Sequence, residues 1–268
     1  MTTRTEAISS TFLWRRVHSL MGLWLVLYLI VHLIVNSQAA LWLGDDGSGF
    51  VQMVNSLESL PYLQVIEITL IGIPLAIHGY WGVLRAFKAK TNSGSTDGSS
   101  PSMKYGRSKA FTWQRLTSWV LLFGIIAHVI QMRFVDMPDK IRVDNQEMHV
   151  VHIKDDPGIE SLAKRIGVTI KKDGSNITAS AATPGKVILL TVRETFKSPL
   201  MCVLYTIFVL AAAFHAFNGF WTSLITWGAL LSYRSQKAFL PICWVGVGML
   251  AFLGLAAIWG SYWINLRA

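Results

Sequence analysis

Five long apolar stretches, separated by polar connections, make up most of the chain. Each is longer than the roughly 20 residues that a helix needs to cross the hydrocarbon core of a bilayer. A bilayer offers no partners to backbone polar groups, so such stretches cross it as helices. The pattern predicts an all-α integral membrane protein with transmembrane helices at residues 17–42, 61–88, 111–135, 198–231 and 238–264.

The charges of the connections predict how these helices are oriented. The first connection, residues 43–60, contains no Lys or Arg. Basic residues gather instead before the first helix and in the second and fourth connections, at Arg4, Arg15, Arg16, Arg85, Lys88, Lys90, Lys104, Arg107, Lys109, Arg234 and Lys237. Lys and Arg accumulate on the cytoplasmic side. We therefore expect a multi-pass protein of the cytoplasmic (inner) membrane with its N-terminus cytoplasmic and its C-terminus external. The polar start leads straight into the first helix, so no cleavable signal peptide is expected.

The third connection is too long for a plain turn, because loops of this length usually carry structure of their own. Alternating apolar residues predict strands at 148–153 and 186–192, and a short helix is expected at 159–166, before Gly167. We interpret this connection as a small extracytoplasmic α/β insertion. The expected division is helices 1–3 within 1–135, the insertion at 136–197, and helices 4–5 within 198–268. The second connection is rich in Gly, Ser and Thr between residues 91 and 102 and is typical of a flexible linker.

Composition agrees with the membrane class and excludes several others. The 268 residues are 52% hydrophobic and 15% charged, whereas soluble domains have about 25% charged residues. The net charge of +9 does not indicate nucleic-acid binding, because many of the basic residues lie in the N-terminal segment and in the short connections beside the predicted helices. Cys202 and Cys243 both lie in apolar stretches and neither belongs to a CxxC motif. A disulfide framework, a zinc site and covalently attached haem are therefore not expected.

Four histidines lie inside the predicted transmembrane helices, one on each of the first four: His32, His78, His128 and His215. An ionisable side chain within a membrane span is a candidate functional residue, since burying it there is costly without a partner. One such histidine would equally fit a hydrogen bond to a neighbouring helix. Four, on four different helices, indicate a shared role.

The depths of these histidines predict two pairs. At 1.5 Å per residue, His32 lies about 24 Å from Arg16 and His128 about 28 Å from Lys109, so both are near the outer face. His78 lies only about 10 Å from cytoplasmic Arg85 and is near the inner face.

His215 lies about 26 Å along helix 4 from its external start, which places it near the inner face with His78. Neutral imidazole is a good iron ligand, and helix bundles hold cofactors between facing side chains. We therefore expect two bis-histidine haems, bound by His32 with His128 and by His78 with His215.

Glycines one turn from three of the ligands, Gly82, Gly124 and Gly219, lie on the same helix faces as their histidines. A missing side chain there would let a flat macrocycle approach the backbone, although ordinary small-residue helix packing is an equal alternative. His18, with Arg16 and Ser19 beside it, is expected at an inner haem propionate or at the lipid interface. His149 and His152, in the insertion, are predicted to be surface residues.

Several segments resemble the five-helix, di-haem cytochrome b subunit of succinate:quinone oxidoreductases, that is, of succinate dehydrogenase and fumarate reductase. They follow the family's chain order over all five helices: FLWRRVHSLMG at 12–22, VHLIVN at 31–36, SLPYLQVIEI at 59–68, IHGYWG at 77–82, WQRLTS at 113–118 and FHAFNGFW at 214–221. In that family the histidines of helices 1 and 3 hold one haem b and those of helices 2 and 4 the other, in agreement with the pairs expected from depth. The family's third connection is normally short, so the insertion at 136–197 is a departure from it.

The resemblance implies a flavoprotein and an iron–sulfur subunit on the cytoplasmic side, with electrons passing through the haems to a quinone, typically menaquinone. The dicarboxylate chemistry belongs to the flavoprotein, so no catalytic residue for it is expected in this chain. Gln114 and Arg115 match a QR pair of the family and are expected at inner-haem propionates, or alternatively at lipid phosphates. For the quinone the candidates are Asn36, Gln38, Trp42, Glu67 and Arg133. Glu67 is expected either to relay protons or to form an interfacial pair.

Two other functions agree less well with the sequence. A histidine-lined proton or metal transporter would usually show internal repeats and broken helices, and neither is evident in the sequence. A di-haem cytochrome b of the hydrogenase or nitrate reductase type would carry two histidines on each ligand helix. Here only the first helix, with His18 and His32, has such a pair.

Overall fold

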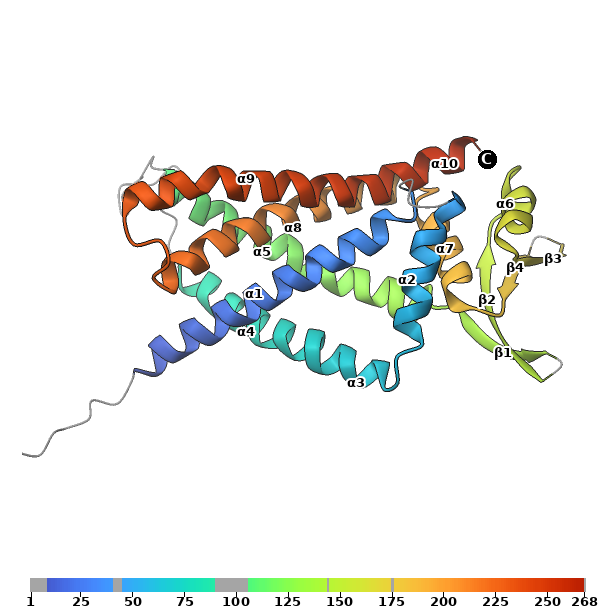
Figure 1. The fold of residues 1–268 in the computed structure, drawn as a ribbon, viewed down its shortest axis with the longest axis horizontal. Helices are drawn as coiled ribbons and strands as arrows, with labels where there is room; N and C mark the ends of the chain where they lie inside the picture. Colours follow the sequence, from blue (N-terminus) through green and yellow to red (C-terminus); the bar gives the residue numbers. More distant parts are fainter. Residues whose placement is uncertain (1–8, 41–44, 90–105, 144, 175, 268) are drawn as a thin grey trace, which may run out of the picture. The chain divides into compact units, whose positions relative to one another are not determined.

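The computed structural model describes residues 9–40, 45–89, 106–143, 145–174 and 176–267. These residues include five helical segments long and apolar enough to cross a membrane, at Ser10–Ser37, Leu63–Lys88, Gly106–Val135, Pro199–Thr226 and Tyr233–Ile264 (Figure 1). They confirm the five predicted spans to within several residues at each end. Two helices end earlier than predicted, at Ser37 and at Thr226, and Gly228 then turns the chain with a φ of 81°.

Two of the five segments are interrupted by one turn of π-helix, and the third ends in one. The first and fourth segments are the continuous helices α1 (Ser10–Ser37) and α8 (Pro199–Thr226). The others consist of α3 (Leu63–Glu67), a π-turn at Ile68–Gly72 and α4 (Ile73–Lys88); of α5 (Gly106–Ile130) and a π-turn at Gln131–Val135; and of α9 (Tyr233–Leu255), a π-turn at Ala256–Gly260 and α10 (Ser261–Arg267). Single π-turns inside α-helices are frequent at functional sites.

Large apolar side chains remain uncovered along these helices, as the membrane interpretation requires. Over its most apolar 18-residue window, the segment that contains α5 buries none of its residues, and α1 buries 6% of them. Phe123 and Val245 are 68% and 73% exposed. Contiguous apolar surface of this extent is unusual on a soluble protein and suits contact with lipid tails.

The insertion contains a four-stranded antiparallel sheet and two helices. The strands are β1 (Asp139–Val143), β2 (Gln146–Ile153), β3 (Thr169–Asp173) and β4 (Asn176–Ala181), in the order β1-β2-β4-β3. The predicted strand at 148–153 lies within β2. The predicted helix is α6 (Ile159–Ile166), and Gly167 ends it in the left-handed conformation, with a φ of 66°. Inward-facing residues of β2 and β4 form a core with α6 and α7 (Pro184–Thr195).

The predicted strand at 186–192 is wrong, because this segment forms α7. Thr183 is extended and Pro184 occupies the first turn, which is a favoured helix start. Val187 and Leu190 pack into the core of the sheet, whereas Leu189 and Val192 pack into a second cluster with residues of α1, α2 (Ser48–Glu58) and α8. A helix buried on two sides has a nearly continuous apolar run, so its sequence resembles that of a buried strand.

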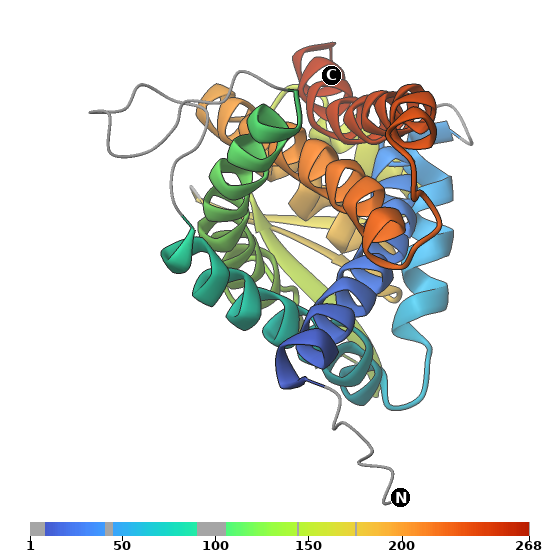
Figure 2. The same ribbon diagram turned by 90° about the vertical axis from the view of Figure 1, so that its left-hand side faces the viewer.

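Helix α7 lies between the sheet and α2 (Figures 1 and 2). The Gly185 backbone N–H donates to Asn55 Oδ1 of α2 at 2.8 Å. Arg165 of α6 donates to both carboxylate oxygens of Asp46, at 2.7 and 3.1 Å. These hydrogen bonds lower the pKa of Asp46 and raise that of Arg165. The first connection is thereby attached to the insertion by specific polar contacts as well as by apolar packing.

Replacing Leu189 by alanine should destabilise this part of the protein. Leu189 is fully buried in the second cluster, and removing a buried leucine side chain costs about 2–5 kcal/mol. We expect a lower midpoint of thermal unfolding for the detergent-solubilised protein, measured by near-ultraviolet circular dichroism. Ile141→Ala is the control, since Ile141 is 44% exposed. Equal midpoints for the two variants would contradict this packing.

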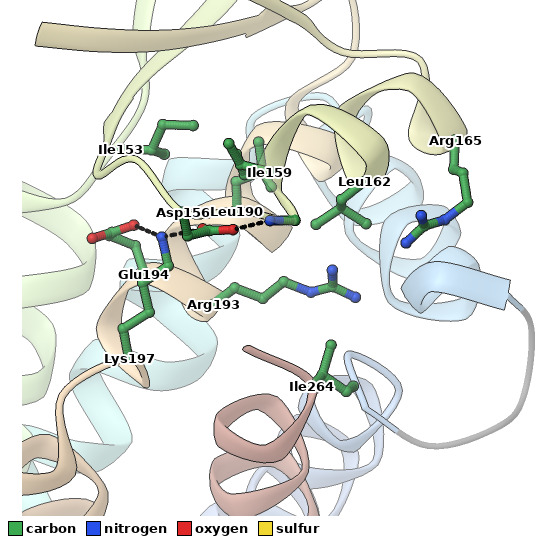
Figure 3. Close-up of a pocket in the computed structure, with 11 residues that line it drawn as sticks. Ile153, Asp156, Ile159, Leu162, Arg165, Leu190, Arg193, Glu194, Lys197 and Ile264 are labelled. Atoms are coloured by element: carbon green, nitrogen blue, oxygen red, sulfur yellow. Dashed lines mark hydrogen bonds and ion pairs between the residues drawn. The ribbon is translucent and has the colours of Figure 1, made fainter. Parts of the chain in front are cut away.

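A cavity of about 220 Å³ lies between the insertion and α10, and it is lined by residues of β2, α6, α7 and the adjoining loops and by Ile264 (Figure 3). One side is apolar. On the other, Lys197 Nζ lies 2.7 Å from Asp156 Oδ2 and 2.8 Å from Glu194 Oε2. Burial lowers the pKa of Lys197, but these two hydrogen bonds outweigh it and the pKa is raised. The lining of this cavity includes none of the site residues predicted from the sequence.

The prediction that both histidines of the insertion are surface residues is wrong for His149. His149 is only 8% exposed, because it lies on the covered part of β2, and its Nε2 is 3.9 Å from Glu147 Oε1. His152, three residues further along the same strand, is exposed as predicted.

The chain divides into two compact units. Unit 1 comprises residues 1–29, 64–119 and 212–247, and unit 2 comprises residues 30–63, 120–211 and 248–268. His78 and His215 belong to unit 1, and His32 and His128 to unit 2. Each predicted ligand pair therefore lies within one unit.

Candidate functional site

In unit 1, His78 of α4 and His215 of α8 face each other. Their ring centroids are 6.3 Å apart and their planes are nearly perpendicular, at 82°. His78 Nδ1 lies 3.1 Å from the backbone carbonyl oxygen of His18. A carbonyl can only accept, so Nδ1 carries the proton and Nε2 keeps its lone pair. The hydrogen bond thus selects the tautomer that can bind a metal through Nε2.

His215 is held in the same way by Thr117 of α5. Thr117 Oγ1 lies 3.3 Å from His215 Nδ1 and donates its own proton to the carbonyl of Trp113, at 2.8 Å. The threonine oxygen therefore accepts the N–H of Nδ1, and His215 also keeps its Nε2 lone pair. Gln114 Nε2 donates to the His215 carbonyl at 3.1 Å.

His18 and Gly22 complete the surroundings of His78. The His18 ring stacks on the His78 ring, with centroids 4.1 Å apart and planes 7° apart. His18 Nδ1 is buried and has no hydrogen-bond partner among the described residues. A Cβ at Gly22 would lie 2.8 Å from His78 Cε1, and one at Gly82 3.7 Å from His18 Cε1. Gly22 was not identified from the sequence, although it follows His18 by four residues as Gly82 follows His78.

The other residues predicted near this pair have partners within the protein. The Arg16 guanidinium lies 4.9 Å from the ring of Trp227, whose indole N–H donates to Ser19 Oγ at 3.1 Å. Arg115 donates to the Ala89 carbonyl at 3.0 Å. Asn218, which was not singled out from the sequence, donates to Gln114 Oε1 at 2.7 Å, and a Cβ at Gly219 would lie 3.4 Å from Gln114 Nε2. Gly219 and Gln114 therefore contact each other beside His215.

In unit 2, His32 of α1 and His128 of α5 form the second pair. Their ring centroids are 5.9 Å apart and the planes again lie at 82°. His128 Nδ1 is 3.2 Å from the Tyr205 hydroxyl. Asn36 Nδ2 donates to the His32 carbonyl at 2.8 Å and lies 3.5 Å from His32 Nε2.

Gly124 has a different neighbour from the other two predicted glycines. A Cβ there would lie 2.5 Å from the ring of Phe208 on α8. Phe208 is also 6.0 Å from the His128 ring, centroid to centroid. Gly124 therefore lets α8 pack closely against α5 beside His128, as expected for small-residue helix packing.

Both pairs fit haem better than a bare metal ion. With metal–nitrogen bonds of about 2 Å and roughly 1 Å from nitrogen to ring centroid, two imidazoles that bound one metal ion between them would have centroids about 6 Å apart. The observed 5.9 and 6.3 Å agree. Within the described part of the chain, no group of three or more His, Cys, Asp or Glu side chains is placed to hold a metal ion. Two ligands suit an iron whose other positions are filled by a macrocycle, and the buried, unpartnered His18 Nδ1 suits a polar substituent at its edge.

The described quinone candidates are distributed over both units. Gln38 is 5% exposed, and its Oε1 has no partner among the described residues. Arg133 lies 3.9 Å from Glu58. Gln38 and Arg133 belong to unit 2 and Glu67, which is half-buried, to unit 1. Trp42 lies outside the described residues.

Comparison with known proteins gives one informative relative. The chain is 28% identical over 248 residues to the succinate dehydrogenase cytochrome b558 subunit of Bacillus subtilis (strain 168). The similarity covers 92% of this chain and 95% of that protein. None of the protein-family models matches the chain. Because the similarity runs through nearly the full length of both proteins, it confirms the resemblance drawn from the sequence motifs.

Proposed function

We propose that this chain, a homologue of a succinate dehydrogenase cytochrome b subunit, binds two haem b groups and transfers electrons between an iron–sulfur subunit and a membrane quinone. The observation that carries the proposal is the pair of facing imidazoles in each unit, 5.9 and 6.3 Å apart. Each spacing suits one iron between two rings. The chain would serve succinate dehydrogenase or fumarate reductase as the membrane anchor.

Haem, when bound, supplies a one-electron carrier, and the protein supplies its ligands and surroundings. His78 and His215 would hold one haem and His32 with His128 the other. Hydrogen bonds donated by Nδ1–H of His78, His215 and His128 keep these rings in a fixed orientation. The apolar helices around them exclude water, which limits loss of the ligands and side reactions of the iron.

Polar groups around the unit 1 pair suit the propionates of a haem. The buried Nδ1 of His18 can donate to a carboxylate, and Arg16 lies two residues before it on α1. Arg115 and Gln114 extend this polar set from α5. Because hydrogen bonds to ionised groups are the strong ones, these residues would fix the rotation of the haem about the axis joining its two ligands.

The homology supports the proposed partners. The flavoprotein subunit would carry out the dicarboxylate chemistry, and the iron–sulfur subunit would pass electrons to the haem held by His78 and His215. Lys and Arg in the N-terminal segment and in the second and fourth connections favour docking on the cytoplasmic side. The haem held by His32 and His128 would lie near the external face and deliver electrons to the quinone, for which menaquinone is proposed.

For the quinone, Gln38 has the strongest support among the candidates. Its buried Oε1 can accept a hydrogen bond from a hydroquinone hydroxyl. Arg133, paired with Glu58, lies in the same unit. Trp42 and Glu67 complete the proposed set, in which Glu67 would relay protons.

Affinity purification of the tagged chain from its native membrane tests the proposal. We expect a covalent-flavin subunit and an iron–sulfur subunit to copurify, and succinate to produce the sharp α-band of reduced haem b in a difference spectrum. A transporter would give no α-band. A cytochrome b of another oxidoreductase would show the α-band on chemical reduction, but would copurify with other subunits and would not respond to succinate.

A further inference from the structure

A chain of three side chains leads away from His128 and ends on a carboxylate. His128 Nδ1 is 3.2 Å from the Tyr205 hydroxyl, which is 3.0 Å from Gln131 Oε1. Gln131 Nε2 is in turn 3.0 Å from Asp136 Oδ2. We infer that Tyr205, linked to Asp136 through Gln131, is a positioning residue that orients His128 and lowers the reduction potential of the haem it binds. This inference rests on the proposed function.

The carboxylate of Asp136 determines the direction of each hydrogen bond between His128 and Asp136. An ionised carboxylate only accepts, so Gln131 donates through Nε2 and presents Oε1 to Tyr205. Tyr205 then donates its hydroxyl proton to Gln131 and accepts from His128 with its oxygen. His128 is left with the proton on Nδ1 and the lone pair on Nε2, the form that binds iron.

Packing holds the Tyr205 ring in place independently of its hydroxyl. Phe196 and Phe208 contact it edge to face, with centroid distances of 5.3 and 6.2 Å. Gln131 begins the π-turn that ends the third membrane segment, and the Asp136 backbone N–H donates to its carbonyl at 2.7 Å. The glutamine and the aspartate are therefore fixed relative to each other by the backbone. Tyr205→Phe would remove the hydroxyl and retain the ring contacts.

The unit 1 pair has no equivalent chain among the described residues. His78 donates to a backbone carbonyl, and His215 donates to Thr117, which donates to another backbone carbonyl. The hydrogen bonds from His78 and from His215 therefore both end on neutral backbone carbonyls. A hydrogen-bond chain that ends on a negative charge polarises each bond along it and makes the imidazole a stronger electron donor. Such a ligand stabilises the ferric form, so the haem of His32 and His128 should be harder to reduce than it would be without the chain.

Potentiometric titration of the purified complex, followed by visible spectroscopy, tests this inference. The titration step that His32→Ala abolishes identifies the affected haem. In Tyr205→Phe both haems should remain bound, and the equilibrium for reduction of this haem alone should shift by roughly tenfold toward the ferrous form. Asp136→Asn should shift the same step in the same direction by less. Electron paramagnetic resonance of the oxidised protein should show a change in the signal of this haem only.

Tyr262→Phe is the matched control, since Tyr262 packs against the same apolar cluster of unit 2. It should leave both steps unchanged. The inference is overturned if the wild-type complex binds two haems and neither Tyr205→Phe nor Asp136→Asn moves this step, or if both haems shift equally. A wild-type complex without two haems would overturn the proposed function instead, so the two failures can be told apart.

Discussion

Replacing His128 by alanine should reduce the haem content of the purified complex from two groups per chain to one. The iron between His32 and His128 would lose one of its two protein ligands, and the cavity left behind would not hold the macrocycle in a fixed position. His32→Ala should remove the same haem. His78→Ala and His215→Ala should each remove the other. The haem-to-polypeptide ratio, measured as the pyridine haemochrome, together with a redox titration of each variant, checks this.

Two further histidines provide the controls. His152→Ala changes an exposed residue of β2 and should leave both haems bound. His18→Ala should also keep both, because its ring stacks on His78 without being one of the facing pair. Loss of both haems from His18→Ala alone, or loss of the same haem from His32→Ala and His78→Ala, would contradict the ligand assignment.

Replacing Gly22 by leucine should remove the haem held by His78 and His215 and leave the other. A Cβ at this position would lie 2.8 Å from His78 Cε1, closer than real Cβ contacts, so the imidazole would have to move. The His78 ring cannot shift freely, because its Nδ1 is hydrogen-bonded to the backbone carbonyl of His18, which lies on the same helix as Gly22. We therefore expect the ring to leave its position opposite His215. Haem content and the redox titration of the complex measure the result.

The matched control is Gly248→Leu on α9. Within the described structure, a Cβ there meets nothing within 4 Å, so the variant makes the same helical substitution without a close contact. It should retain both haems. If Gly22→Leu also keeps two haems with unchanged potentials, the close contact between α1 and His78 does not exist in the folded protein.

The membrane fold could be predicted from the sequence because it depends on one property, the length of uninterrupted apolar residues. The same reasoning predicted the ends of the membrane-spanning helices only approximately. Gly228, which turns the chain after α8, lies inside the predicted span 198–231 and is as compatible with lipid as its neighbours. The π-turns were not predicted, since they replace a hydrogen-bond pattern without changing the apolar run.

The insertion was predicted in part, and its failures have a common cause. Helix α6 has one buried face and a glycine cap, so its periodicity identifies it. Helix α7 is buried by the sheet on one side and by the second apolar cluster on the other. Its apolar residues therefore do not show the spacing of a helix with one buried face. His149 is buried for the same reason: its cover comes from segments distant in the sequence.

The sequence identifies the four proposed ligands by their residue type, whereas it does not identify the residues that contact them. A histidine within an apolar span is conspicuous by its type alone. Thr117, Gln131 and Tyr205 are ordinary helix residues, and their roles depend on contacts between different helices. Gly22 is an exception, since its spacing of four from His18 repeats that of Gly82 from His78 and could have identified it.

The number of haems bound by the purified wild-type chain is the most direct test of the proposed function. It should be determined after expression with sufficient haem supply, by comparing the pyridine haemochrome with the polypeptide concentration. We expect two haem b groups per chain, which titrate as two separate redox steps. A colourless protein, or one that binds a single haem, would contradict the assignment of the four histidines to two iron sites.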